Sequence, residues 1–159
     1  MHKEMRRKDR LLTAEETMAV LDKCEYGILS TVNAEGEPYG VPVSYAVIDG
    51  AVYFHCATVG EKLDNITQNP AVCFTVVGDT EPTGETGFST YFESCVIFGK
   101  VREITDAEEK TAALEAMVMR YLPDYMHNFE RIMGQQGKAT KVFAISAERI
   151  TGKAKKKSV

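Results

Sequence analysis

Residues 39–57 have the sequence YGVPVSYAVIDGAVYFHCA, in which two runs rich in β-branched and aromatic residues flank the dipeptide Asp49-Gly50. Asp-Gly between such runs is typical of a two-residue hairpin loop, because both loop positions need a positive φ. The sequence therefore predicts two antiparallel strands, at 39–47 and 51–57, with a register fixed by the turn.

This register separates the two faces of the hairpin, because side chains alternate along a strand. One face is apolar and is expected to point into a barrel: Val43, Tyr45, Val47, Val52, Phe54 and Cys56. The other face is partly polar and uncharged, and suits covering by a ligand or partner: Pro42, Ser44, Ala46, Tyr53, His55 and Ala57. The register places Ser44 opposite His55, and Pro42 opposite Ala57.

The remaining pattern is mostly β. Further strands are predicted at 28–32, 71–77, 88–104 (with a bulge at Gly99) and 140–147, and helices at 12–26, 60–68, 105–122 and 124–133. Capping boxes are expected at Thr13/Glu16, Thr58/Glu61 and Thr105/Glu108, and Gly27 is expected to end the first helix. Tight turns between successive strands favour antiparallel pairing, so the predicted class is mainly β, a six- to seven-stranded β-barrel with added helices.

Composition limits the functional classes. The 159 residues are 44% hydrophobic and 26% charged, which suits one domain over 1–159. The net charge is −4, with +3 in residues 1–10, +5 in 149–159 and therefore −12 between them. An acidic body argues against binding to nucleic acid. Residues 153–159 are expected to form a basic, flexible tail, with contact to an anionic ligand or membrane as the alternative.

The sequence has no motif for several other chemistries. It contains no G-x-S-x-G, P-loop, H-E-x-x-H or C-x-x-C pattern, and no run of about 18 apolar residues. No metal site and no membrane span are predicted, and the expected location is cytoplasmic. Cys24, Cys56, Cys73 and Cys95 are expected to be small buried hydrophobes. The methionines at 117, 119, 126 and 133 are interpreted as core or interface filler.

The segment after the hairpin has the features of an anion site. Gly60 allows close approach, and Lys62 is expected in the first turn of a helix, where the dipole disfavours a cation. Backbone amides and a lysine at a helix N-terminus together suit a phosphate. The alternative is that Lys62 is simply solvated.

The same residues resemble a known family. The segments are Gly40-Val-Pro-Val-Ser44-Tyr45, Tyr53-Phe-His55-Cys-Ala57-x-x-Gly60-x-Lys62-Leu-x-x-Ile66, Met5-Arg-Arg-Lys-Asp9, Ser94-Cys-Val-Ile-Phe-Gly-Lys-Val101 and Ile150-Thr-Gly-Lys153. Together they are similar to flavoproteins related to pyridoxamine 5′-phosphate oxidase, in the nitroimidazole-resistance branch. The similarity extends over nearly the whole chain.

The resemblance implies an antiparallel split β-barrel that forms a homodimer with two FMN molecules at the subunit interface. It assigns the following residues to FMN: Val43, Ser44, Tyr45, His55, Cys56, Ala57, Gly60, Lys62 (to the phosphate) and Ser94. Glu61 departs from the oxidases, which have a second phosphate-binding arginine there. Their C-terminal substrate-phosphate motif is also missing, which argues against oxidation of vitamin B6.

Two functions of different classes follow. The first is an NAD(P)H-dependent FMN reductase of small aromatic or nitro compounds, with His55 as the catalytic residue, since imidazole changes charge near neutral pH. The second is a non-catalytic protein that stores flavin or binds haem, for which His55 and His127 are the candidate ligands. A dimeric module without ligand is a third reading, and His55 as a purely structural strand residue is an alternative to its catalytic role.

Overall fold

The computed structural model describes residues 3–84 and 87–157. Its elements, in chain order, are η1 (Lys8–Arg10), α1 (Ala14–Lys23), β1 (Gly27–Val32), β2 (Pro38–Val43), β3 (Tyr45–Ile48), β4 (Ala51–Cys56), α2 (Glu61–Gln68), β5 (Ala71–Pro82), β6 (Thr90–Glu103), α3 (Ala107–Tyr121), η3 (Pro123–Asn128), α4 (Phe129–Gln136), η4 (Gly137–Ala139) and β7 (Lys141–Lys155). No helix in the described ranges is long and apolar enough to cross a bilayer.

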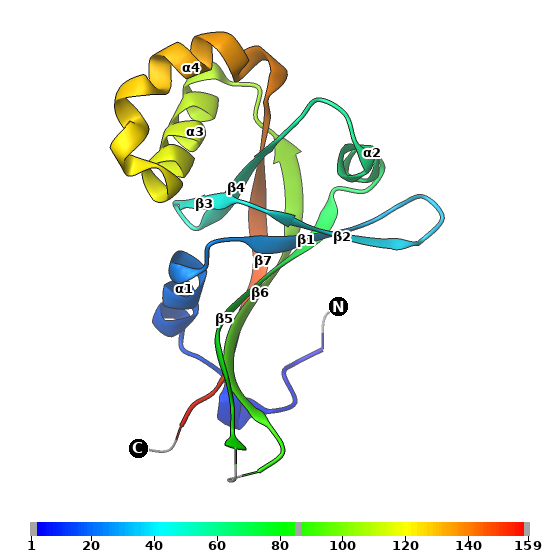
Figure 1. The fold of residues 1–159 in the computed structure, drawn as a ribbon. Coiled ribbons are helices and arrows are strands. Elements are labelled where there is room, and N and C mark those ends of the chain that lie inside the picture. The colour runs from blue at the N-terminus through cyan, green and yellow to red at the C-terminus, as the bar shows by residue number, and fades with distance from the viewer. Residues whose placement is uncertain (1–2, 85–86, 158–159) are drawn as a thin grey trace.

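The strands form one antiparallel sheet in the order β2-β1-β5-β6-β7-β4-β3 (Figure 1). The two edge strands, β2 and β3, are consecutive in sequence and are joined by Ser44 alone. Because two residue steps span about 7 Å at most, the sheet must curl until its edges nearly meet at this point. The result is a split barrel with Ser44 at the seam between its two edges, and the predicted mainly β class is confirmed.

The barrel interior contains the apolar face predicted for the hairpin. Tyr45, Val52 and Phe54 are fully buried there with Phe74 from β5, and the rings of Tyr45 and Phe74 meet edge to face with centroids 5.0 Å apart. The opposite face of the hairpin packs, through Ala46 and Tyr53, against α3 and α4. Part of the face expected to meet a ligand is therefore covered by the protein's own helices.

The hairpin turn is confirmed, with positive φ at both Asp49 and Gly50. Its ladder runs from Ile48↔Ala51 to Tyr45↔Phe54 and then stops. The predicted continuation to Ser44↔His55 and beyond is wrong, because the chain leaves this sheet edge at Ser44 and Pro42 pairs with β1 instead. The single strand predicted at 39–47 is therefore two strands, β2 and β3.

Several boundaries differ from prediction. The capping box of Thr13 with Glu16 is confirmed, but α2 begins after Gly60, and α3 has Asp106 as its N-cap. The expected caps at Thr58 and Thr105 are wrong. Gly27 does not end α1: it starts β1, where a Cβ would lie 2.1 Å from the Phe74 ring.

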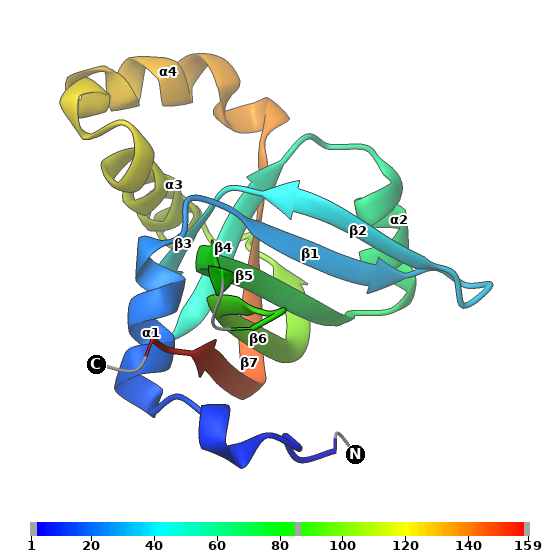
Figure 2. The ribbon, with the colours of Figure 1, turned by 60° about the horizontal axis from the view of Figure 1, so that its bottom comes forward.

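Two of the long strands, β5 and β7, extend further than predicted. β5 continues through Pro82, past the predicted end at residue 77, and β7 continues through Lys155, past the predicted end at residue 147. Residues 153–155 are therefore paired strand and not flexible tail, while 158–159 lie outside the described residues. The predicted bulge is confirmed by a register shift between Phe98 and Gly99. Figure 2 shows the N-terminal segment running beside the end of β7, where Leu11 bridges Lys153.

Candidate functional site

The seam of the barrel is where the predicted site residues gather. Ser44 links the two edge strands, and His55 and Cys56 end strand β4, which pairs with β3. A pocket of about 460 Å³, here called the Lys62 pocket, opens at this point. Its lining residues are Pro42, Val43, Ser44, His55, Cys56, Ala57, Lys62, Ala139 and Thr140. Six of the nine residues assigned to FMN by resemblance lie on this one wall.

Helix α2 brings the cation to the pocket. Gly60 is its N-cap, with φ 138°, a conformation that favours glycine. The first helical hydrogen bond runs from Leu63 N to Gly60 O at 2.8 Å, so the amides of Glu61 and Lys62 precede the helical ladder. Within residues 3–84 and 87–157, no ion pair includes Lys62. Lys141, whose charge also acts on the Cys56 thiol, is paired with Glu103 at 3.0 Å.

His55 lies between two environments. It is accessible to solvent, yet its Nδ1 is 3.2 Å from the Met117 sulfur on α3, and burial lowers the pKa of the imidazole. A thioether has no proton to donate, so this contact is a hydrogen bond only when Nδ1 carries the proton. In the neutral ring, Nε2 is then a hydrogen-bond acceptor.

Cys56 is not a nucleophile candidate. Burial raises the pKa of its thiol, and Lys62 and Lys141 only partly oppose this effect. The thiol therefore stays protonated at neutral pH. All four cysteines are free; Cys24 and Cys95 are buried, as expected, whereas Cys56 and Cys73 are only partly buried. The described part of the chain contains no cluster of His, Cys, Asp and Glu that could hold a metal.

A second pocket, of about 390 Å³ and here called the aromatic pocket, adjoins the first and shares Ser44, His55 and Thr140 with it. Its other lining residues come from α3, η3, α4 and η4: Leu114, Met117, Val118, Tyr121, Leu122, Tyr125, Phe129, Ile132, Met133, Gln136 and Gly137. Two of the four methionines interpreted as core or interface filler, Met117 and Met133, line this pocket, and Met117 also belongs to the buried cluster behind it. Periodicity identifies an apolar helix face, but it does not distinguish a packed core from a pocket wall.

Two residues of α3 hold the seam in place. The Tyr121 hydroxyl accepts a hydrogen bond from Tyr45 N at 3.0 Å and donates to Glu25 O at 2.6 Å. Arg120 donates to the carbonyls of Asp22 and Cys24, at 2.7 Å each, at the C-terminal end of α1. No sequence pattern indicates this link, because its partners are nearly one hundred positions apart.

Three predicted residues lie off the pocket wall. The Tyr45 side chain points into the core, where its hydroxyl donates to backbone carbonyls of α1, so its role is structural. Gly60 acts through the backbone of α2. Ser94 pairs with Lys153 near one end of β7, whereas His55 pairs with Val142 near the other end. At about 3.3 Å per residue, these sites lie on opposite ends of a long strand (Figure 1).

His127 does not line either pocket at the seam. It is exposed on η3, and its ring nitrogens contact Asp124 O and the Asn128 amide. It therefore does not join His55 as a second imidazole on one wall.

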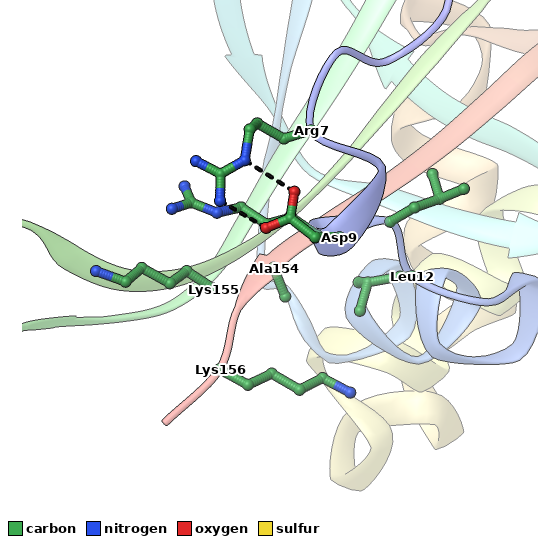
Figure 3. A pocket seen from close by; sticks show the side chains of 8 residues that line it. Arg7, Asp9, Leu12, Ala154, Lys155 and Lys156 are labelled. Atoms are coloured by element: carbon green, nitrogen blue, oxygen red, sulfur yellow. Dashed lines mark hydrogen bonds and ion pairs between the residues drawn. The ribbon is translucent and has the colours of Figure 1, made fainter. Parts of the chain in front are cut away.

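A third pocket, formed by both ends of the chain, is basic but largely self-paired (Figure 3). Arg7 binds Asp9 through two hydrogen bonds, which hold the Asp9 pKa at about 2, and Lys156 pairs with Glu16. Two of its four cationic residues, Arg7 and Lys156, thus have carboxylate partners already.

A curled antiparallel sheet with its seam next to a cationic pocket defines the split-barrel class of protein. The family model described as pyridoxamine 5′-phosphate oxidase matches residues 13–154, so the chain belongs to that family, as its sequence predicted. No curated protein matches the chain by sequence.

Several solved structures share the fold. One is provisionally named a 5-nitroimidazole antibiotic resistance protein, from Bacteroides thetaiotaomicron (21% identity, 96% of each chain, TM-score 0.77). The flavocytochrome Anf3 of Azotobacter vinelandii matches with 20% identity over 97% of this chain and 73% of its own (TM-score 0.79). A FAD-binding protein of Mesorhizobium loti matches with 24% identity over 92% and 97% (TM-score 0.64).

Proposed function

We propose that the protein binds FMN at the seam and uses it as an NAD(P)H-dependent reductase of small aromatic or nitro compounds. One observation carries the proposal: Lys62, which forms no ion pair within the described residues, lines one pocket together with the polar Ser44 and His55 and the apolar ends of two strands. A flavin mononucleotide has matching parts, namely a dianionic phosphate, a polar chain and a flat ring.

Different residues of the Lys62 pocket suit different parts of FMN. Lys62 and the first amides of α2 would hold the phosphate, since ammonium and helix N-terminal amides both stabilise an anion. Val43, Cys56 and Ala57 present apolar surface for the ring. Bound flavin supplies the hydride-transfer chemistry, and the protein supplies binding and orientation.

His55 would act as a neutral hydrogen-bonding group beside the ring. Its lowered pKa keeps it uncharged at neutral pH, and the Met117 contact leaves Nε2 to accept a proton or hydrogen bond. Because His55 lines both pockets, it would contact a cofactor bound in one and an acceptor bound in the other.

The distance between Ser94 and His55 supports a homodimer as part of the proposal. If Ser94 contacts the flavin, it must come from a partner subunit, because in one chain it lies at the other end of β7. A twofold dimer would then contain two equivalent sites, each built from both subunits.

Purified protein incubated with FMN and then desalted tests the proposal. We expect a band near about 450 nm and bleaching on addition of NADH or NADPH. Lys62→Ala should weaken FMN binding about 10- to 100-fold, whereas Lys100→Ala, which removes an exposed lysine on β6, should not.

The alternative functions predict different spectra. A band near about 400 nm after incubation with haem would favour a haem-binding protein. Flavin that binds but stays oxidised with both nicotinamides would favour storage. Unchanged affinity in Lys62→Ala would contradict the proposed phosphate site.

A further inference from the structure

The aromatic pocket has a composition unlike that of the Lys62 pocket beside it. Its walls are the apolar faces of α3 and α4, with the rings of Tyr121, Tyr125 and Phe129. Apart from the two tyrosine hydroxyls, the polar side chains are a small set that includes the three shared residues: Ser44, His55, Gln136 and Thr140. An apolar pocket with a few convergent polar groups is the usual form of a small-molecule site, and about 390 Å³ lies in the usual size range.

Charge defines what this pocket can accept. Among the described residues that line it, none is Asp, Glu, Lys or Arg. An anion would lose its hydration there without meeting a cation, since Lys62 lines only the adjoining pocket. The pocket therefore favours a neutral molecule.

Its walls also favour a flat molecule of variable outline. Aromatic side chains bind planar rings by stacking or edge contacts. Met117 and Met133 add flexible thioethers, which adapt to different shapes and are common at promiscuous binding surfaces. Leu122 and Tyr125 are 52% and 60% exposed, so apolar surface already faces solvent at this site.

We propose that the aromatic pocket binds neutral, planar aromatic compounds and excludes their anionic counterparts. The inference that such a compound is the electron acceptor rests on the proposed function, because the shared residues Ser44 and His55 would place it beside the flavin. The binding itself requires only this chain's own residues.

Benzamide and benzoate provide a matched pair of probes, since they have the same shape and differ in charge. Isothermal titration calorimetry of the FMN-loaded protein should show benzamide binding at least about 10-fold more tightly than benzoate. Equal affinities, or tighter binding of benzoate, would overturn the proposal.

A pair of variants on α3 locates the binding. Val118 lines the pocket, whereas its neighbour Met119 is 53% exposed and does not. Val118→Phe should fill the space and weaken benzamide binding at least about 10-fold, and Met119→Phe should leave it unchanged. Melting temperature and the flavin spectrum of each variant check that the fold and the Lys62 pocket persist.

The outcomes separate this proposal from the proposed function. Benzamide binding that Val118→Phe abolishes, in a protein that takes up no FMN, would support the pocket and contradict the flavin function. FMN binding without any benzamide binding would support the flavin function and contradict the proposal for the aromatic pocket. If Val118→Phe changes only the oligomeric state in gel filtration, the pocket is a surface between subunits and the proposal is wrong.

Discussion

Ser44 shows how one residue can connect architecture and site. It is the only residue between the two edge strands. It lines the Lys62 pocket and the aromatic pocket, and also a separate pocket that Arg120 and Tyr121 line. Neither strand continues through it, so the surrounding groups are positioned by side chains of α3 instead of by a ladder. Local geometry at the seam therefore depends on few contacts.

Burial of His55 should be visible in the pH dependence of stability. Because its pKa is lowered in the folded protein, the unfolded chain binds a proton more tightly. Folding stability is therefore lost as the pH falls below the ordinary histidine pKa of about 6.5. His55→Gln should lose less free energy of unfolding than the wild type over this range, measured by urea denaturation at several pH values. Parallel curves would show that His55 does not titrate differently on folding.

Gly27 should be intolerant of a side chain for a steric reason. A Cβ there would lie 2.1 Å from Phe74, a fully buried ring, whereas a Cβ at Gly40 on edge strand β2 meets nothing closer than 3.5 Å. Gly27→Ala should cost about 1–3 kcal/mol of unfolding free energy. Gly40→Ala should change it by less than about 1 kcal/mol. Equal effects in chemical denaturation would contradict the clash.

At the scale of elements, the sequence predicted local structure well and long-range structure poorly. The Asp49-Gly50 turn and the alternation around it follow from neighbouring residues, and both are confirmed. The strand break at Ser44 was missed because it results from closure of the whole sheet. The caps at Thr58 and Thr105 were misplaced because Gly60 and Asp106 compete for the same role nearby.

Prediction of the site also succeeded for residues close together in sequence and failed for distant ones. Resemblance found the residues near one hairpin, including Ser44, His55 and Lys62, which the fold brings to one pocket. It did not find Met117 or Tyr121, which reach the seam from a helix more than sixty positions later. Contacts of this kind depend on how α3 packs on the sheet, and sequence periodicity carries no information on that packing partner.

The link between α3 and the seam can be tested at the Tyr121 hydroxyl. Tyr121→Phe removes the acceptor for Tyr45 N and the donor to Glu25 O, and should cost about 1–3 kcal/mol of unfolding free energy. Amide hydrogen exchange at Tyr45 should become faster. Tyr125→Phe, on an exposed residue of η3, serves as control and should have little effect. An unchanged exchange rate at Tyr45 would show that the hydroxyl does not secure the seam.

At the scale of the whole molecule, the proposed dimer makes a complementation test possible. If each site takes Lys62 from one subunit and Ser94 from the other, a mixed dimer of Lys62→Ala and Ser94→Phe has one intact site. Random assortment makes about half of the dimers mixed, so co-expression should restore about a quarter of wild-type FMN content. Each variant alone should bind little. No recovery in the mixture would mean that the two residues do not serve one site across an interface.

The sheet can be completed only after strand β7 has been synthesised, because β7 lies between two earlier strands. It pairs with β4 on one side, for example Ile145 with Val52, and with β6 on the other. Until residues 141–155 have left the ribosome, both of those earlier strands have an edge that no later strand covers. Such edges invite pairing with other chains. The nascent protein should therefore depend on chaperones most strongly just before its closing strand emerges.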